Sequence, residues 1–199
     1  MQWLKYTFRI ELDSWVFARA CHGGNIEIVE WLGKEDCPWK YSSISQKRAL
    51  DGAVKGSHLE VLKWLRGKGC PWGEGTCLAA AREGHRDVLK YLHENGCPWD
   101  EVACQKAARY GHLDVLKYLH ESGCPWDKRS FRIAAVYGHL DVLKYLHYNG
   151  CPWDEFTWRA AAKSTRKWLN ENGSPQGKRE NSVIRIHQID VDLSTFSLH

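Results

Sequence analysis

The chain has 199 residues, of which 43% are hydrophobic and 26% charged, and its formal net charge is +4. It holds no run of about 18 apolar residues, and residues 1–9 lack the pattern of a secretory signal, so we expect neither a membrane span nor export. We therefore expect an intracellular protein, cytoplasmic or nuclear, without a membrane partner.

The motif Cys-Pro-Trp divides the chain into repeats. It occurs at residues 70–72, 97–99, 124–126 and 151–153, which are 27 residues apart, and a fifth copy lies at residues 37–39. A fixed period of this length is typical of a solenoid built from stacked units. The sequence therefore predicts an array and is best analysed repeat by repeat.

The start of the chain is irregular. Residues 1–12 match the second half of a repeat and predict a partial capping segment, and residues 13–39 form a first repeat. The next connection carries six extra residues, so residues 40–47 are the one place where a longer recognition finger could form.

Each regular repeat predicts two helices. In the repeat after Trp99, small side chains at Ala103, Ala107 and Ala108 share one face of a first helix that ends at Gly111. A second helix follows over residues 113–121 and ends at residues 122–123, because Pro125 prevents its continuation. We call these the first and second helix of a repeat.

The last repeat is shortened. Residues 160–162 lead directly into residues 167–170, so about four residues are missing at the turn, and the repeats end near residue 175. Residues 176–199 begin with a polar stretch and then alternate apolar with polar residues, which predicts a flexible or strand-like tail.

The repeated pattern resembles a known family. A helix, a Gly-His turn, Leu-Asp-Val-Leu-Lys-Tyr-Leu and then Asn-Gly is similar to an ankyrin repeat, in the short variety with Gly-Cys-Pro-Trp-Asp found in large DNA viruses and unicellular eukaryotes. The resemblance covers residues 13–175. It implies an all-α solenoid of about six helix pairs, degenerate at both ends, which binds partners on the concave side formed by the first helices.

The cysteines and histidines predict structural roles. Packed helices lie about 8–10 Å apart, whereas a disulfide needs Cα atoms within about 7 Å, so we expect reduced cysteines. His93 and Cys97 show half of a zinc-ligand spacing, but each repeat offers at most two ligands, so we expect no metal and no cofactor. His85, His112 and His139 recur after each turn glycine, which favours hydrogen bonding at the turn over catalysis, and we expect no enzyme and no catalytic residues.

The repeated tryptophans have two interpretations. Their rings could stack on nucleobases, or they could pack inside the array, and the neighbouring proline in a fixed connection favours packing.

The residues that vary between repeats predict the binding surface. Counted from each tryptophan, positions +3, +6, +7 and +10 of the first helix face away from the alanines, and we call these positions the first-helix face. In the later repeats they are rich in basic residues and lack acidic ones, which predicts a monomeric scaffold that holds an acidic or extended segment of a partner protein. The alternative is binding of a nucleic-acid backbone by the same surface. The candidate partner-binding residues are Arg82, Gln105, Arg109, Tyr110, Arg129, Arg132, Tyr137, Phe156 and Arg159. The matching positions of the first two repeats are Trp15, Ala18, Arg19, His22, Arg48, Asp51, Gly52 and Lys55.

Overall fold

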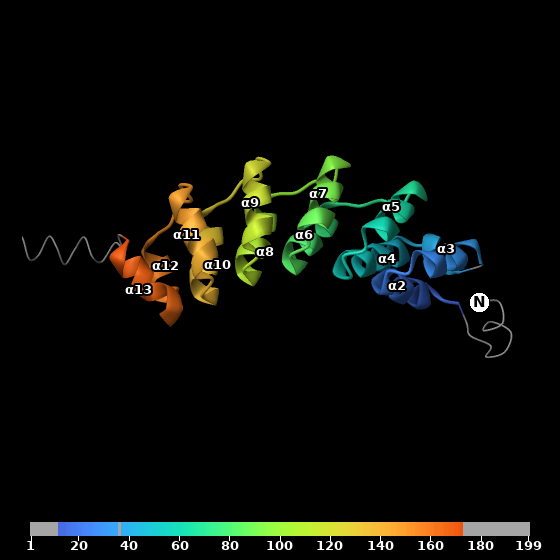
Figure 1. Cartoon of the computed structure of the whole chain (residues 1–199), viewed down its shortest axis with the longest axis horizontal. Coiled ribbons are helices and arrows are strands. Elements are labelled where there is room, and N and C mark those ends of the chain that lie inside the picture. Colours follow the sequence, from blue (N-terminus) through green and yellow to red (C-terminus); the bar gives the residue numbers. More distant parts are fainter. Residues whose placement is uncertain (1–11, 36, 173–199) are drawn as a thin grey trace, which may run out of the picture. The chain divides into compact units, whose positions relative to one another are not determined.

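A computed structural model describes residues 12–35 and 37–172, and over these residues all regular structure is helical (Figure 1). This confirms the predicted helical repeat solenoid. The chain divides into two bodies, residues 1–125 and 126–199, each described here by itself. Most of the predicted capping segment and the whole predicted tail lie outside the described residues, so these two domain predictions remain predictions.

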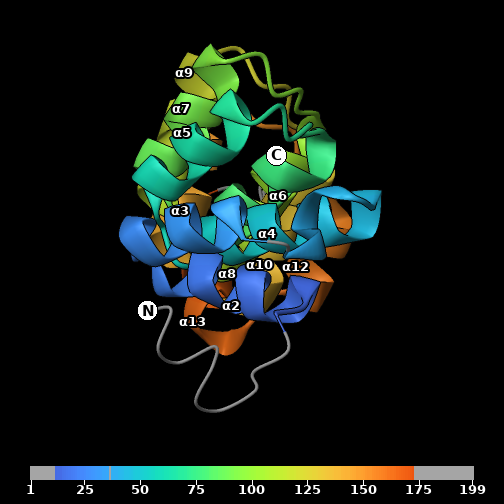
Figure 2. The ribbon, with the colours of Figure 1, turned by 90° about the vertical axis from the view of Figure 1, so that its right-hand side faces the viewer.

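The N-terminal body consists of helix pairs. The first helices pack on one another in sequence order, and so do the second helices, which follow one another in Figure 2. The first helices are α2 (Ser14–Gly23), α4 (Ser43–Lys55), α6 (Glu74–Glu83) and α8 (Glu101–Tyr110), and the second helices are α3 (Ile26–Lys34), α5 (Leu59–Gly67), α7 (Arg86–Glu94) and α9 (Leu113–Glu121).

The C-terminal body repeats the arrangement with two pairs. They are α10 (Lys128–Tyr137) with α11 (Leu140–Tyr148), and α12 (Glu155–Ala160) with α13 (Lys163–Glu171). None of the helices in the described parts of either body is both long enough and apolar enough to cross a bilayer.

Local sequence sets the ends of the first helices. The Asp100 carboxylate accepts a hydrogen bond from the Val102 amide at 3.0 Å, and Asp127 and Asp154 cap α10 and α12 in the same way. At the other end, Gly84 adopts a left-handed φ of 79° and stops α6. The predicted helix stops at the turn glycines are therefore confirmed.

Alanines bring the first helices together. Ala103, Ala107 and Ala108 are fully buried, and so are Leu116 and Leu119 of the second helix behind them. A methyl side chain lets neighbouring helices approach closely, while the leucines fill the space between the two rows of helices. The core therefore follows the repeat pattern read from the sequence.

The six extra residues of the second repeat do not form a finger. Three of them lengthen α4, which has 13 residues where α6 and α8 have 10. Two more lie in the connection before α4, which follows a short 3₁₀ helix, η1 (Pro38–Lys40), and one, Ser57, lies in the turn after α4. The idea of a finger at residues 40–47 is wrong, because the Ser42 side chain caps α4 and starts the helix early.

Each Cys-Pro-Trp motif closes its own repeat. The thiols of Cys37, Cys70, Cys97, Cys124 and Cys151 donate to a backbone carbonyl 24 residues earlier, at 3.2 to 3.8 Å. In four of these five cases that carbonyl belongs to the residue that caps the first helix. No disulfide joins any two of the eight buried cysteines, all of which lie in the described residues.

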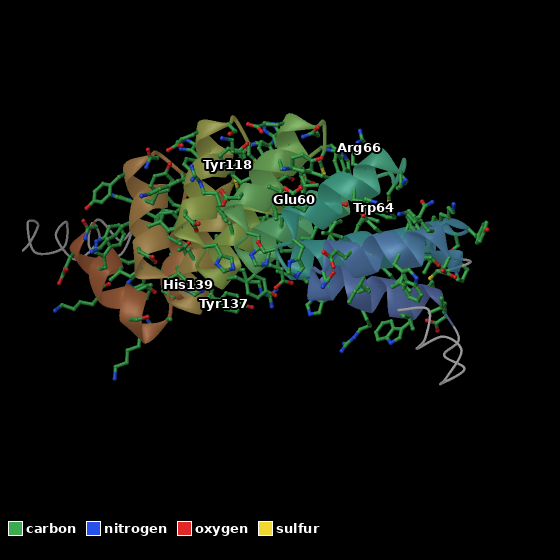
Figure 3. The ribbon with its side chains drawn as sticks, turned by 45° about the vertical axis from the view of Figure 1, so that its right-hand side comes forward. Glu60, Trp64, Arg66, Tyr118, Tyr137 and His139 are labelled. Carbon is green, nitrogen blue, oxygen red and sulfur yellow. The ribbon has the colours of Figure 1, made fainter. Side chains whose placement is uncertain are left out.

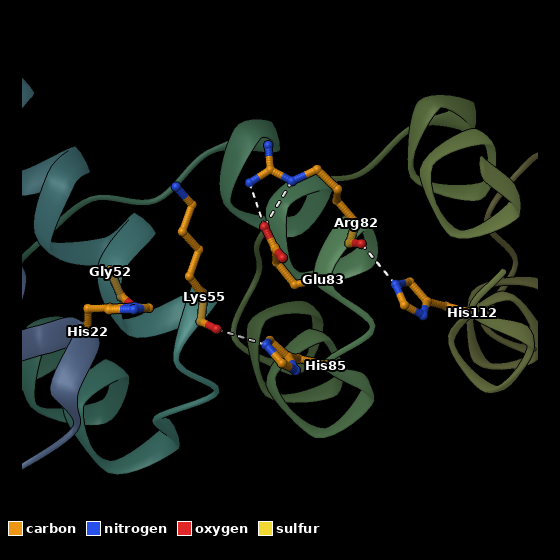
Figure 4. A network of polar contacts seen from close by, with 7 residues as sticks. All are labelled: His22, Gly52, Lys55, Arg82, Glu83, His85 and His112. Carbon is orange, nitrogen blue, oxygen red and sulfur yellow. Dashed lines mark hydrogen bonds and ion pairs between the residues drawn. The ribbon is translucent and has the colours of Figure 1, made fainter. Parts of the chain in front are cut away.

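The histidines link one repeat to the preceding one. His58 Nε2 donates to the carbonyl of His22 at 2.9 Å. His85 Nε2 donates to the carbonyl of Lys55 at 3.1 Å, and His112 Nε2 to that of Arg82 at 2.9 Å (Figure 4). The glycine makes room for the ring, because a Cβ on Gly84 would lie 2.6 Å from His112. The predicted hydrogen-bonding role is confirmed at these three histidines.

The last repeat is joined to the preceding one by other hydrogen bonds in place of the histidine bond. α12 has only 6 residues, so the Gly-His turn is missing, as the sequence predicted. The Ala162 amide and the Thr165 hydroxyl donate instead to the Ala135 carbonyl, at 2.9 and 2.8 Å.

Candidate partner-binding face

The first-helix face is exposed or half-buried at most of the predicted positions in both bodies. Ala18 and Gly52 are exceptions, since both are buried. A Cβ on Gly52 would lie 2.6 Å from the Ala18 carbonyl oxygen, so α2 and α4 approach too closely for either residue to face solvent. These two positions are therefore covered by the contact between the helices.

Arg82 and Tyr110 border one hollow between α6 and α8. The hollow is about 440 Å³ in volume and is lined also by Glu83 and His112. The Arg82 guanidinium binds the Glu83 carboxylate at 2.6 Å, as Figure 4 shows, and the Tyr110 ring stacks on His112 with centroids 6.4 Å apart. The structure therefore brings these two candidates together, with the arginine already engaged.

The other two candidates of the N-terminal body lie on α8. Arg109 is exposed, with its guanidinium carbon 5.9 Å from the centroid of the Tyr110 ring, and Gln105 is half-buried. Tyr110 is 47% exposed and is available as an aromatic contact.

In the C-terminal body, two of the three candidate arginines have an acidic neighbour. Arg159 binds Glu155 at 2.8 Å, one helical turn away, and Arg129 lies 3.8 Å from Asp127. Arg132 is exposed and forms no ion pair within the described residues. The aromatic candidates are exposed, Tyr137 at the end of α10 by 48% (Figure 3) and Phe156 by 64%.

The sequence analysis missed the acids beside these arginines. Glu83, Asp127 and Glu155 stand outside the positions that define the first-helix face, yet their side chains reach it. The spacing of Glu155 and Arg159, four residues apart on one helix, is a signal that could have been used.

A second hollow lies between α2 and α4. Its volume is about 260 Å³, and its lining is the full set of first-helix-face positions of the first two repeats: Trp15, Ala18, Arg19, His22, Arg48, Asp51, Gly52 and Lys55. Arg19, Arg48 and Lys55 are exposed, and in the part of the chain that is described none of them forms an ion pair with a carboxylate. We call this hollow the α2–α4 pocket.

The residues that suggested half of a zinc site are engaged in other contacts. The His93 ring stacks on Trp99 at 3.6 Å between centroids, and the Cys97 thiol donates to a carbonyl. Within residues 12–35 and 37–172, no three His, Cys, Asp or Glu side chains are grouped so that they could hold a metal ion.

The tryptophans of the repeat motif pack on other aromatic rings. Trp39 stacks on Phe17 at 4.6 Å and Trp153 on Phe131 at 5.4 Å, while Trp72 and Trp126 meet a tyrosine edge to face. The predicted packing of these tryptophans is therefore confirmed.

Comparison with known proteins assigns the repeats. The family model described as ankyrin repeats in three copies matches residues 77–156. Over these residues the chain is similar to ankyrin repeats.

The ankyrin fold extends over more of the chain. The ankyrin repeat domain of human ASB11, known from a crystal structure, matches with a TM-score of 0.66 and 20% sequence identity, covering 80% of this chain and 83% of that one. A search of curated protein sequences gives no match. Ankyrin repeats act as scaffolds that bind other proteins on an extended surface, so the fold points to protein binding.

Proposed function

We propose that this chain is a non-enzymatic scaffold that binds an acidic or extended segment of a partner protein on the concave side formed by its first helices. The observation that supports this best is the pairing of exposed aromatic rings with arginines on that face, as at Arg109 and Tyr110 in α8. Aromatic and arginine side chains carry a large share of the binding energy of protein interfaces.

The ion pairs on this face are compatible with an acidic partner. An exposed ion pair contributes only about 0.2–1 kcal/mol, so a carboxylate of the partner can replace Glu155 or Asp127 at small cost. Arg132, which forms no ion pair within the described residues, is available directly. Two parallel hydrogen bonds from a guanidinium to a carboxylate would fix the orientation of the partner.

Binding of a nucleic-acid backbone is the alternative. It requires several cations that neutralise successive phosphates, and its affinity then falls steeply with salt. Acidic residues that alternate with the arginines, as in α6 and α12, weigh against such a track. A first-helix face that bound DNA or RNA with a steep salt dependence would favour this alternative.

The remaining features of the proposal concern the whole chain. We infer that the protein works as an intracellular monomer, that its repeats are of the short Cys-Pro-Trp variety, and that they extend to residue 175 between a capping segment and a tail. Buried thiols throughout the array are consistent with a reducing compartment.

A pull-down from nuclease-treated cell lysate tests the proposal. The bait proteins are the wild type and a variant with Arg109→Glu, Arg132→Glu and Arg159→Glu, and we expect the variant to lose a protein that the wild type retains. A control with Lys34→Glu, Lys90→Glu and Lys167→Glu has the same change in charge on exposed positions of second helices and should retain that protein. Equal capture by all three baits, with unchanged melting temperatures, would show that the first-helix face is not the binding surface.

A further inference from the structure

We propose that the α2–α4 pocket is the anchor site for this scaffold: it takes one acidic side chain of an extended partner peptide, with apolar residues of the peptide on either side. The inference rests on the proposed function and places the strongest contact in the first two repeats, outside the candidate residues chosen from the sequence.

The pocket arises from the close approach of α2 and α4. Ala18 and Gly52 are buried at the contact between the helices, so only small groups form the floor. The longer side chains of the lining therefore project around a hollow rather than fill it. Its volume of about 260 Å³ lies just below the range of roughly 300–1,000 Å³ that is typical of small-molecule sites, which favours a single side chain as the occupant.

The charges of the pocket favour an anionic group. Arg19, Arg48 and Lys55 surround it, and none of them forms an ion pair within the described residues. Arg82 and Arg159 in the later repeats already bind carboxylates at 2.6 and 2.8 Å. A carboxylate that enters the α2–α4 pocket displaces no such partner, so it gains more there than beside Arg82 or Arg159.

Asp51 distinguishes a peptide from a nucleic-acid backbone. Its carboxylate lines the same pocket, where it would repel a phosphate backbone but can accept a hydrogen bond from a peptide amide. An extended peptide presents amides on both sides of an acidic residue, so it can satisfy the cations and Asp51 together.

Exposed apolar side chains lie beside the charges. Trp15 lines the pocket and is 56% exposed, and Tyr41 and Ile44, which precede Arg48 by seven and four residues, are 77% and 63% exposed. Ile44 and Arg48 are one turn apart on α4, so they share a side of that helix. These apolar groups fit a peptide in which the acid is flanked by apolar residues.

Selection from a phage-displayed library of random peptides tests the pocket with the full chain as bait. We expect enriched sequences with an acidic residue next to apolar ones, and we expect a synthetic, fluorescein-labelled copy of the most enriched sequence to bind in a polarisation assay. The double variant Arg48→Gln, Lys55→Gln should bind this peptide at least tenfold more weakly, and Trp15→Ala should also weaken it. Lys47→Gln is the matched control, because Lys47 is the exposed neighbour of Arg48 on α4 but does not line the pocket.

The outcomes separate the anchor site from the general function. If the peptide binds all pocket variants normally but is lost on Arg132→Gln, Arg159→Gln, the anchor site is wrong and the scaffold function stands. If the enriched peptides lack acidic residues, both the anchor site and the acidic partner are contradicted. If labelled single-stranded DNA binds the wild type and the double variant loses it, the pocket takes phosphates and the peptide proposal is overturned. Circular dichroism melts of each variant ensure that lost binding does not reflect unfolding.

Discussion

Ser130 and Ala103 occupy the same position in successive first helices, 27 residues apart, and both are fully buried. Ala103 has no polar side-chain atom, whereas the Ser130 hydroxyl has no hydrogen-bond partner among residues 12–35 and 37–172. A buried hydroxyl without a partner costs about 1–3 kcal/mol of desolvation. The methyl side chain of Ala103 shows that a smaller apolar group fits this position.

Replacement of Ser130 by alanine should therefore stabilise the protein. We expect Ser130→Ala to raise the free energy of unfolding by about 1 kcal/mol, because it removes the unpaired hydroxyl and leaves little empty space. Urea unfolding followed by circular dichroism measures the change, with Ala103→Ser as the reciprocal variant that should destabilise. A lower midpoint for Ser130→Ala would mean that the hydroxyl has a partner in solution.

At the scale of the element, α6 differs from its neighbours at its start. Gly73 caps this helix without a side-chain hydrogen bond, where aspartate caps α8, α10 and α12. The backbone at Gly73 is extended, with φ of −143°, and an added Cβ would meet nothing within 4 Å. The position can therefore accept the aspartate of the other repeats.

We expect Gly73→Asp to stabilise α6. The carboxylate caps the helix, and the unfolded chain loses flexibility, which together contribute about 0.5–1 kcal/mol. Thermal unfolding should show a higher midpoint for Gly73→Asp than for Gly73→Ala, since only aspartate adds the capping bond. Equal midpoints for Gly73→Asp and Gly73→Ala would show that the stabilisation comes only from the reduced flexibility of the unfolded chain, and not from the capping bond.

A second feature at this scale is the histidine link between repeats. His112 starts α9, bonds the Arg82 carbonyl of the preceding repeat and covers Gly84. In the first repeat Asn25 takes the matching position and caps its own helix through a bond to the Ile28 amide at 3.1 Å. Asparagine can therefore cap the second helix, but its shorter side chain does not provide the imidazole link.

Substitutions at His112 should separate these two contributions. We expect His112→Ala to destabilise by about 1–2 kcal/mol through the lost hydrogen bond and packing, and His112→Asn to destabilise less because asparagine adds a side-chain cap that His112 does not make. Urea unfolding of the three proteins gives the order. Equal losses for alanine and asparagine would show that the link alone matters.

At the scale of the whole molecule, the thiols form a buried set. Burial raises the pKa of Cys70 from 9.0 to about 11, and those of Cys21 and Cys151 to about 12. The folded protein therefore keeps these protons at a pH where the unfolded chain has lost them. The resulting stability is fully present below pH 9 and falls as the pH rises toward 11 or 12.

Alkaline pH should thus destabilise the protein through its cysteines. Each such thiol contributes a loss of about 1.4 kcal/mol per pH unit above 9 until its folded pKa is reached. We expect the urea midpoint to fall more steeply between pH 8 and pH 10 in the wild type than in a Cys21→Ala, Cys70→Ala, Cys151→Ala variant. If the urea midpoints of the two proteins fell in parallel with pH, groups other than these cysteines would cause the loss of stability at alkaline pH.

Much of this architecture could be predicted from the sequence. The period of Cys-Pro-Trp predicts the helix pairs, and recurrence of Gly-His predicts the turn, because each feature is set by contacts that repeat with the chain. Which arginines form ion pairs could not be predicted. Arg82 pairs with Glu83 and Arg132 forms no ion pair within the described residues, and this depends on side-chain conformations that the repeat pattern does not specify. The α2–α4 pocket depends on the distance between two helices at Gly52, which periodicity does not specify.

The two recurring hydrogen bonds also bear on how such an array changes in length. The thiol bond spans 24 residues within one repeat, and the histidine bond normally spans 30 residues into the previous one. Despite the insertion after Cys37, the Cys70 thiol of the next repeat still bonds a carbonyl 24 residues earlier. The insertion lengthens only the histidine bond of His58, whose acceptor lies 36 residues earlier. A duplicated block of 27 residues would carry its own closing bond and its own link to the block before it. Gene duplication could therefore add or remove repeats without any new contact having to evolve.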